Sequence, residues 1–95
     1  MLKLGTKVYI LDKKHIAQSI AYVVNWSYSL QTLYEPWVVV NRENNSYSLA
    51  RELSDNTIDG CAWYEENQLT TDINEYLEML MEEMITTITD LVNDD

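Results

Sequence analysis

The acidic side chains are the residues of this sequence whose number and spacing could support a specific chemistry. Sixteen Asp and Glu stand against six Lys and Arg, and the formal net charge is −10. All six basic residues lie within residues 1–51 together with three acids, whereas residues 52–95 contain the other thirteen acids and no base. Direct contact with nucleic acid is therefore not expected, because contacts to phosphate depend on Lys and Arg.

The other reactive residue types do not form the pattern of a catalytic centre. His15 is the only histidine, and no neighbour in the sequence marks it as a base. Cys61 is the only cysteine, so no intrachain disulfide can form, and its apolar surroundings favour a small core residue. Adjacent pairs such as Glu65 and Glu66 do not converge on a shared acid–base site, and neither a phosphate-binding loop nor a metal-ligand spacing is present. We expect a nonenzymatic protein without cofactor or metal.

Short strands are predicted over the first two thirds of the chain. Strands are expected at 7–11, 16–28, 37–40, 46–52 and 57–64, with turns at 12–14, 42–45 and 54–56 and a bulge or close backbone approach near Gly60. The longest of them rests on large residues at even positions, namely Ile16, Ile20, Tyr22, Val24, Trp26 and Tyr28. Five antiparallel strands in about 60 residues indicate a small β-barrel or a strongly curled sheet.

One long amphipathic helix is predicted after the strands, with Thr70 or Thr71 as its N-cap. Its apolar half holds Ile73, Tyr76, Leu77, Leu80, Met81, Met84, Ile85, Ile88, Leu91 and Val92, and its acidic half holds Asp72, Glu75, Glu78, Glu82, Glu83 and Asp90. The fold class is therefore α+β, and residues 1–95 form a single domain with the β-barrel over 4–69 and the acidic helix over 70–93.

Both halves of this helix allow two interpretations. Glu75, Glu78 and Glu82 would lie ~5–6 Å from one another, a spacing comparable with successive phosphates, so the acidic half either binds a basic partner or is simply solvated. The apolar arc is wider than the roughly 100° that one core usually covers. Either the helix crosses the open end of the barrel and is deeply buried, which we favour, or Met81, Ile85 and Val92 meet a second chain.

Three segments resemble the SH3-like small barrels of phages and mobile elements: GTKVYI at 5–10, WVVV at 37–40 and AWYEENQL at 62–69. The resemblance covers roughly residues 4–69 and implies a fold only, since such barrels carry unrelated functions. In size, charge and single-domain build the chain is also similar to the small acidic inhibitors of nucleic-acid-binding defence enzymes that phages encode, which include anti-CRISPR proteins and DNA mimics.

These patterns predict a cytoplasmic inhibitor that occupies the phosphate-binding surface of a basic nucleic-acid-binding protein. The residues expected to contact that partner are Glu65, Glu66, Asp72, Glu75, Glu78, Glu82 and Glu83, with Trp63 or Tyr64 as a buried anchor. An intracellular protein without membrane contact fits the single cysteine and the lack of a long apolar run. The alternative is a structural or assembly module that forms a homodimer through the helix. Binding of a peptide or a single strand by the aromatic surface of the barrel ranks last.

Overall fold

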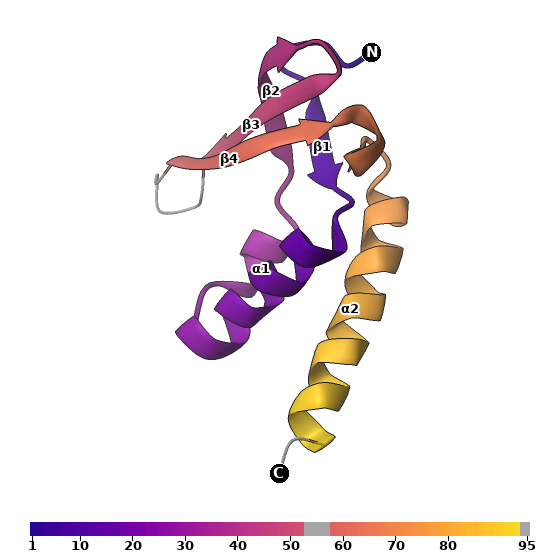
Figure 1. Cartoon of the computed structure of the whole chain (residues 1–95). Coiled ribbons are helices and arrows are strands. Elements are labelled where there is room, and N and C mark those ends of the chain that lie inside the picture. The colour runs from indigo at the N-terminus through magenta and orange to yellow at the C-terminus, as the bar shows by residue number, and fades with distance from the viewer. Residues whose placement is uncertain (53–57, 94–95) are drawn as a thin grey trace.

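The structure is a computed structural model that describes residues 1–52 and 58–93. Within these residues the chain forms one five-stranded antiparallel sheet and two α-helices, with overall dimensions of 46 × 29 × 21 Å (Figure 1). In chain order the elements are β1 (Lys7–Ile10), α1 (Lys13–Trp26), the 3-10 helix η1 (Leu30–Leu33), β2 (Trp37–Glu43), β3 (Ser46–Glu52), β4 (Ile58–Glu65), the 3-10 helix η2 (Glu66–Gln68), β5 (Leu69–Thr70) and α2 (Ile73–Asn93).

The sheet has the strand order β4-β3-β2-β1-β5 and does not close into a barrel. Its register is irregular at two places, between Val39 and Asn41 in β2 and between Tyr47 and Leu49 in β3. Such irregularities increase the local twist, which lets a short sheet curl around its own side chains. The α+β class, the five-stranded antiparallel sheet and the C-terminal helix are confirmed, and the sheet is open rather than closed into a barrel.

Four predicted strands are present with small changes at their ends. β2 continues three residues beyond Val40, and the hairpin to β3 turns at Asn44, whose backbone is left-handed with φ 56°. Asn adopts this conformation more readily than most residues. A Cβ at Gly60 would meet nothing within 4 Å, so the expected close approach is absent there, and the irregular register of β4 lies nearer Trp63. The turn predicted at 54–56 lies outside the described residues.

The strand predicted over 16–28 is wrong, because this segment forms helix α1. Ile16 and Ile20 are buried and Val23 is half-buried, which gives the i, i+4, i+7 spacing of one helix face. Positions 16 and 20 are both even, so they fit a strand alternation equally well. Ala17 and Ala21 favour the helix. The helix ends at Ser27, which is left-handed with φ 58°.

The fifth strand of the sheet is instead the two-residue β5, which pairs with β1 through Tyr9 with Thr70 and Ile10 with Leu69. β5 therefore fixes the start of α2 beside β1.

The N-cap of α2 is Asp72 rather than Thr70 or Thr71: its Oδ1 accepts a hydrogen bond of 2.9 Å from the backbone N–H of Asn74. The hydroxyl of Thr70 in turn accepts from the N–H of Asp72 at 3.0 Å.

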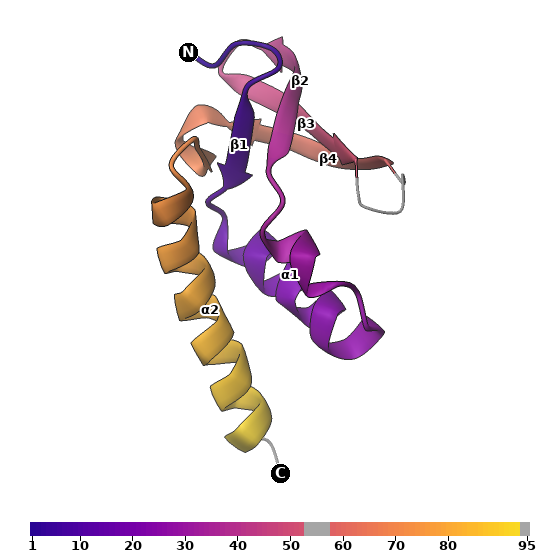
Figure 2. The same cartoon turned by 180° about the vertical axis from the view of Figure 1, so that it is seen from behind.

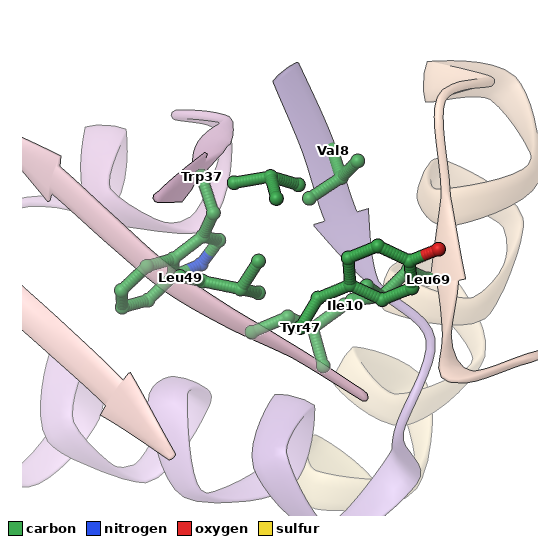
Figure 3. Packing of buried hydrophobic residues seen from close by; sticks show 7 residues of the cluster. Val8, Ile10, Trp37, Tyr47, Leu49 and Leu69 are labelled. Carbon is green, nitrogen blue, oxygen red and sulfur yellow. The ribbon is translucent and has the colours of Figure 1, made fainter. Parts of the chain in front are cut away.

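Two hydrophobic clusters meet at β1, because successive side chains of a strand point to opposite faces. Val8 and Ile10 belong to the inner cluster of the curled sheet (Figure 3), which also contains Trp37, Val39, Tyr47, Leu49 and Leu69. Tyr9 and Leu11 pack on the second cluster, which joins the helices through Ile16, Ile20, Leu33, Tyr76 and Leu80. The sheet and the helix pair are therefore held together by the two faces of one strand.

Candidate partner-binding surface

Helix α2 presents three exposed carboxylates, Glu75, Glu78 and Glu82, on the side that faces away from the sheet and α1. We call these three residues the acidic face. Asp72 and Asp90 are also exposed, and Glu83 is half-buried. Within the described residues no acid of α2 forms an ion pair with a base. The negative charge of this helix is thus open to solvent and is not neutralised by the protein's own Lys and Arg.

Between Ile73 and Asp90, a short seam of α2 is buried against the rest of the molecule. Tyr76 and Leu80 are buried, whereas Leu77, Met79 and Met84 are partly buried. Figures 1 and 2 show that the C-terminal half of α2 runs past α1 and away from the sheet. The interpretation that α2 crosses the open end of a barrel and is deeply buried is therefore wrong.

Three exposed apolar side chains lie along one side of α2, and we call them the apolar stripe: Met81, Ile85 and Ile88. They are 61%, 63% and 53% exposed, respectively. Their i, i+4, i+7 spacing places them on one side of the helix, beside the buried seam. Val92, which was expected in the same stripe, has its side chain outside the described part of the chain, as does Cys61.

The acidic face and the apolar stripe are neighbours on α2. Residues three or four positions apart lie side by side on a helix. Glu78 therefore lies next to Met81, and Glu82 lies next to Ile85. The outer surface of α2 is a row of apolar side chains with a row of carboxylates along one edge.

The two aromatic residues proposed as anchors have different surroundings. Trp63 in β4 is 46% exposed and borders a shallow hollow beside the β2–β3 hairpin, lined by Glu43, Asn44 and Ser46. Tyr64 is half-buried against the inner cluster of the sheet, and its hydroxyl lies 3.3 Å from His15 Nδ1. Trp63 is available to a partner in this structure, whereas Tyr64 contributes to internal packing.

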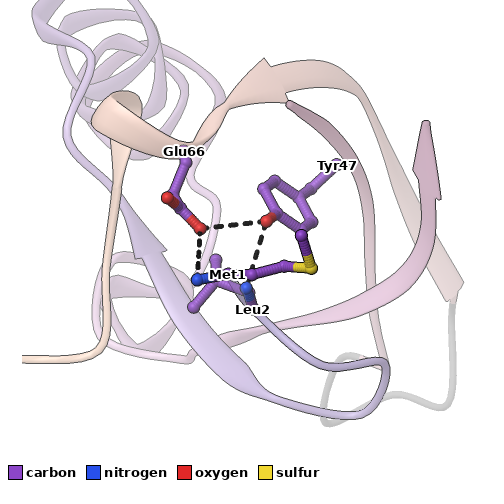
Figure 4. A network of polar contacts seen from close by, with 4 residues as sticks. All are labelled: Met1, Leu2, Tyr47 and Glu66. Atoms are coloured by element: carbon purple, nitrogen blue, oxygen red, sulfur yellow. Dashed lines mark hydrogen bonds and ion pairs between the residues drawn. The ribbon is translucent and has the colours of Figure 1, made fainter. Parts of the chain in front are cut away.

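The two carboxylates at the end of β4 also take part in internal contacts. Glu65 and Gln68 form a capping box around η2, in which the Gln68 side chain accepts from the N–H of Glu65 at 3.0 Å. Glu66 Oε1 accepts a hydrogen bond of 2.9 Å from the Tyr47 hydroxyl and lies 3.2 Å from the amino group of Met1 (Figure 4). The Tyr47 hydrogen bond is the main cause that lowers the pKa of Glu66. Glu66 thus holds the N-terminal segment on the sheet.

A small internal hollow was not expected from the sequence. It has a volume of about 10 Å³ and is lined by Tyr9, Ile10, His15, Glu35, Trp37 and Tyr76. This is close to the lower limit for one water molecule, so a substrate would not fit. The His15 ring lies edge-on to the rings of Trp37 and Tyr64, with centroid distances of 6.0 Å to each. The surroundings of His15 are those of a packed aromatic residue.

A second group of exposed apolar side chains lies at the end of α1 and just after it. The strand predicted over 16–28 did not indicate this group. Trp26, Tyr28 and Leu30 are 70%, 56% and 54% exposed. The rings of Tyr22 and Tyr28 lie 5.5 Å apart, and the N–H of Tyr28 donates to the carbonyl of Tyr22 at the end of the helix. A helix predicted over residues 13–26 would have placed Tyr22 and Trp26 on the solvent side, away from the buried Ile16 and Ile20.

Comparison with known proteins identified no matching family model, curated protein or solved structure. No helix in the described part of the chain is both long and apolar enough to span a membrane. No group of three or more His, Cys, Asp or Glu within residues 1–52 and 58–93 could hold a metal ion. The exposed acidic face and apolar stripe make the surface of α2 the candidate functional site.

Proposed function

We propose that the protein is a nonenzymatic inhibitor that binds a basic nucleic-acid-binding protein through the acidic face of α2. The observation that carries this proposal is that Glu75, Glu78 and Glu82 are exposed together and that no described base pairs with any acid of α2. Their carboxylates would occupy the positions that phosphates take on the partner. Asp72 and Glu65, both exposed, extend the negative surface, whereas Glu83 is half-buried on the side of Tyr76 and Leu80; Trp63 offers an aromatic contact at the sheet.

Charge patterning supports binding over simple solvation. A solvated helix usually alternates acids with bases, whereas α2 contains no Lys or Arg. Like charges at i, i+4 destabilise a helix by roughly 0.2–0.5 kcal/mol per pair. A cationic groove on the partner would relieve this repulsion. The negative electrostatic potential of the acidic face would also attract such a groove before contact.

The proposed architecture is an SH3-like curled sheet that holds the base of α2. The strand order β4-β3-β2-β1-β5 and the three sequence segments that resemble such barrels support this assignment. α1 is inserted between β1 and β2 and covers the seam of α2. A phage origin and a defence enzyme as the partner belong to the same proposal and rest on size, charge and resemblance.

The decisive experiment is capture of host proteins on the immobilised chain at low and at about 0.5 M salt. We expect nucleic-acid-binding proteins to be retained at low salt and released by salt or by added double-stranded DNA. The variant Glu75→Gln/Glu78→Gln/Glu82→Gln should lose this retention. Asp12→Asn, which removes an acid outside α2 and outside the hollow beside Trp63, is the control and should keep it. Retention that survives both salt and the triple variant would contradict the proposal.

A second candidate, an assembly module that forms a homodimer through α2, is favoured by the exposure of Met81, Ile85 and Ile88. Sedimentation over a range of concentrations tests it. A dimer that dissociates on Ile85→Asp would support this function. A monomer at all concentrations would argue against it.

A further inference from the structure

We propose that the apolar stripe of α2 docks an amphipathic helix of the partner whose apolar face is flanked by Lys or Arg. This inference rests on the proposed function and names the element of the partner that α2 contacts. The two helices would lie side by side, with apolar side chains between them and opposite charges along one edge. The structure supports each part of this arrangement separately.

The stripe has the geometry of a helix-packing surface. Met81, Ile85 and Ile88 follow i, i+4, i+7, and they cover two turns, about 10 Å of helix at ~1.5 Å per residue. Each is more than half exposed. Side chains at this spacing form a ridge that fits the groove of a facing helix.

No other described element of the chain covers the stripe. The contact between α2 and α1 uses the buried seam at Tyr76 and Leu80, which lies on a neighbouring side of the helix. Between Met81 and Asp90 no residue of α2 is fully buried. The exposure of Met81, Ile85 and Ile88 shows that the described residues leave the stripe uncovered. The C-terminal half of α2 runs past α1 (Figure 2).

Charge decides which kind of helix fits. Glu78 and Glu82 lie one helical turn from Met81 and Ile85, and α2 has no base to offer. If the α2 helices of two copies packed through their stripes, these carboxylates would be brought toward one another. A partner helix with Lys or Arg beside its apolar face would pair with them, as residues flanking a coiled-coil seam do.

The test uses a labelled synthetic peptide as the probe: a helix with Leu at i, i+4 and i+7 positions flanked by Lys. Two further peptides serve as comparisons, one with Glu in place of every Lys and one with the same residues scrambled. Binding to the full-length protein is measured by fluorescence anisotropy at low and at about 0.5 M salt. We expect the Lys peptide alone to bind, with an affinity that falls as salt rises.

Variants of the protein locate the contact. Met81→Ser/Ile85→Ser should weaken binding of the Lys peptide by at least about tenfold. Val40→Ser is the matched control, because Val40 is a 50% exposed apolar residue of the sheet. Its affinity should equal that of the wild type. Circular dichroism verifies that each variant keeps its helices.

Each contrary outcome has a distinct meaning. No binding of the Lys peptide, equal binding of the scrambled peptide, or an unchanged affinity in Met81→Ser/Ile85→Ser would overturn the docking proposal. Binding of the Lys peptide that is unchanged in Met81→Ser/Ile85→Ser but lost in Glu75→Gln/Glu78→Gln/Glu82→Gln would show that the acidic face binds without the stripe. The docking proposal would then be wrong, and the proposed function would stand. A wild-type dimer that tightens with salt and dissociates in Met81→Ser/Ile85→Ser would show that the occupant is a second copy and overturn the proposal.

Discussion

The ring of Tyr9 in β1 stacks on the ring of Tyr76 in α2, with centroids 4.9 Å apart and an angle of 23° between the planes. The hydroxyl of Tyr76 also donates a hydrogen bond to the backbone carbonyl of Leu33, the last residue of η1. One buried side chain of α2 therefore contacts both the sheet and the segment that follows α1. The position of the acidic face relative to the sheet depends on this residue.

Removal of the Tyr76 hydroxyl should destabilise the fold while leaving the helix in place. In Tyr76→Phe the ring stack remains, but the Leu33 carbonyl loses its partner, so we expect a loss of about 1–2 kcal/mol in the free energy of unfolding. Tyr76→Ala also removes the ring and should cost about 3–5 kcal/mol. Urea titration measures both. Equal stabilities of Tyr76→Phe and the wild type would show that the hydrogen bond contributes nothing.

The same residue predicts a loss of stability at alkaline pH. Burial raises the pKa of Tyr76 from 10.0 to about 12. The unfolded chain then ionises first, so the stabilisation is complete below pH 10 and is lost as the pH rises toward 12. We expect this residue to account for on the order of 1–2 kcal/mol of that loss. Tyr76→Phe should show a smaller difference between pH 9 and pH 12, and identical pH profiles would contradict the assignment.

The sequence predicted secondary structure correctly where its hydrophobic residues fit only one periodicity, either that of a helix or that of a strand. The C-terminal helix was predicted over 70–93 and α2 spans Ile73–Asn93, because ten apolar residues repeat at helical spacing and no strand pattern fits them. The hairpin from β2 to β3 followed from polar residues between two β-rich runs. α1 was missed because Ile16 and Ile20 satisfy both periods, and because the exposed rings of Tyr22 and Trp26 completed an apparent alternation.

The candidate site was predictable in its charges and not in its contacts. The acids at 75, 78 and 82 could be placed on one helix face by their spacing alone. The part of the apolar arc that is covered depends on how α1 packs on Leu80. This contact joins residues far apart in the sequence, so local patterns do not predict it. For the same reason the internal roles of Tyr64 and Glu66, which contact His15 and Tyr47, could not be read from local patterns.

At acidic pH the contact between Glu66 and Tyr47 should make a measurable contribution. The pKa of Glu66 lies below its ordinary value of 4.5, mainly because the Tyr47 hydroxyl donates to the carboxylate. The stabilisation is therefore present above pH 4.5 and is lost as the pH falls through the lowered pKa. Glu66→Gln should flatten the fall in stability over this range, and Tyr47→Phe should do the same. An unchanged acid profile in both variants would contradict the contact.

Two substitutions of opposite effect test the helical assignment of residues 13–26. Ala21→Pro removes a backbone donor from α1 and should cost about 3 kcal/mol or more, with a loss of helical circular dichroism. Ser27→Gly relieves the left-handed backbone at φ 58° and should raise stability by up to about 1 kcal/mol. If the segment were a strand, Ser27→Gly would weaken it instead.

The apolar arc of α2 should divide into a part that stabilises the fold and a part that does not. Leu80 is 1% exposed, so Leu80→Ala should cost about 2–5 kcal/mol through lost burial and the cavity left behind. Ile85 is 63% exposed, so Ile85→Ser should change the free energy of unfolding by no more than about 0.5 kcal/mol. Urea unfolding of the two variants, at one protein concentration, measures the difference. A large loss in Ile85→Ser would mean that the stripe is covered in the isolated protein, and the surface assigned to the partner would then be wrong.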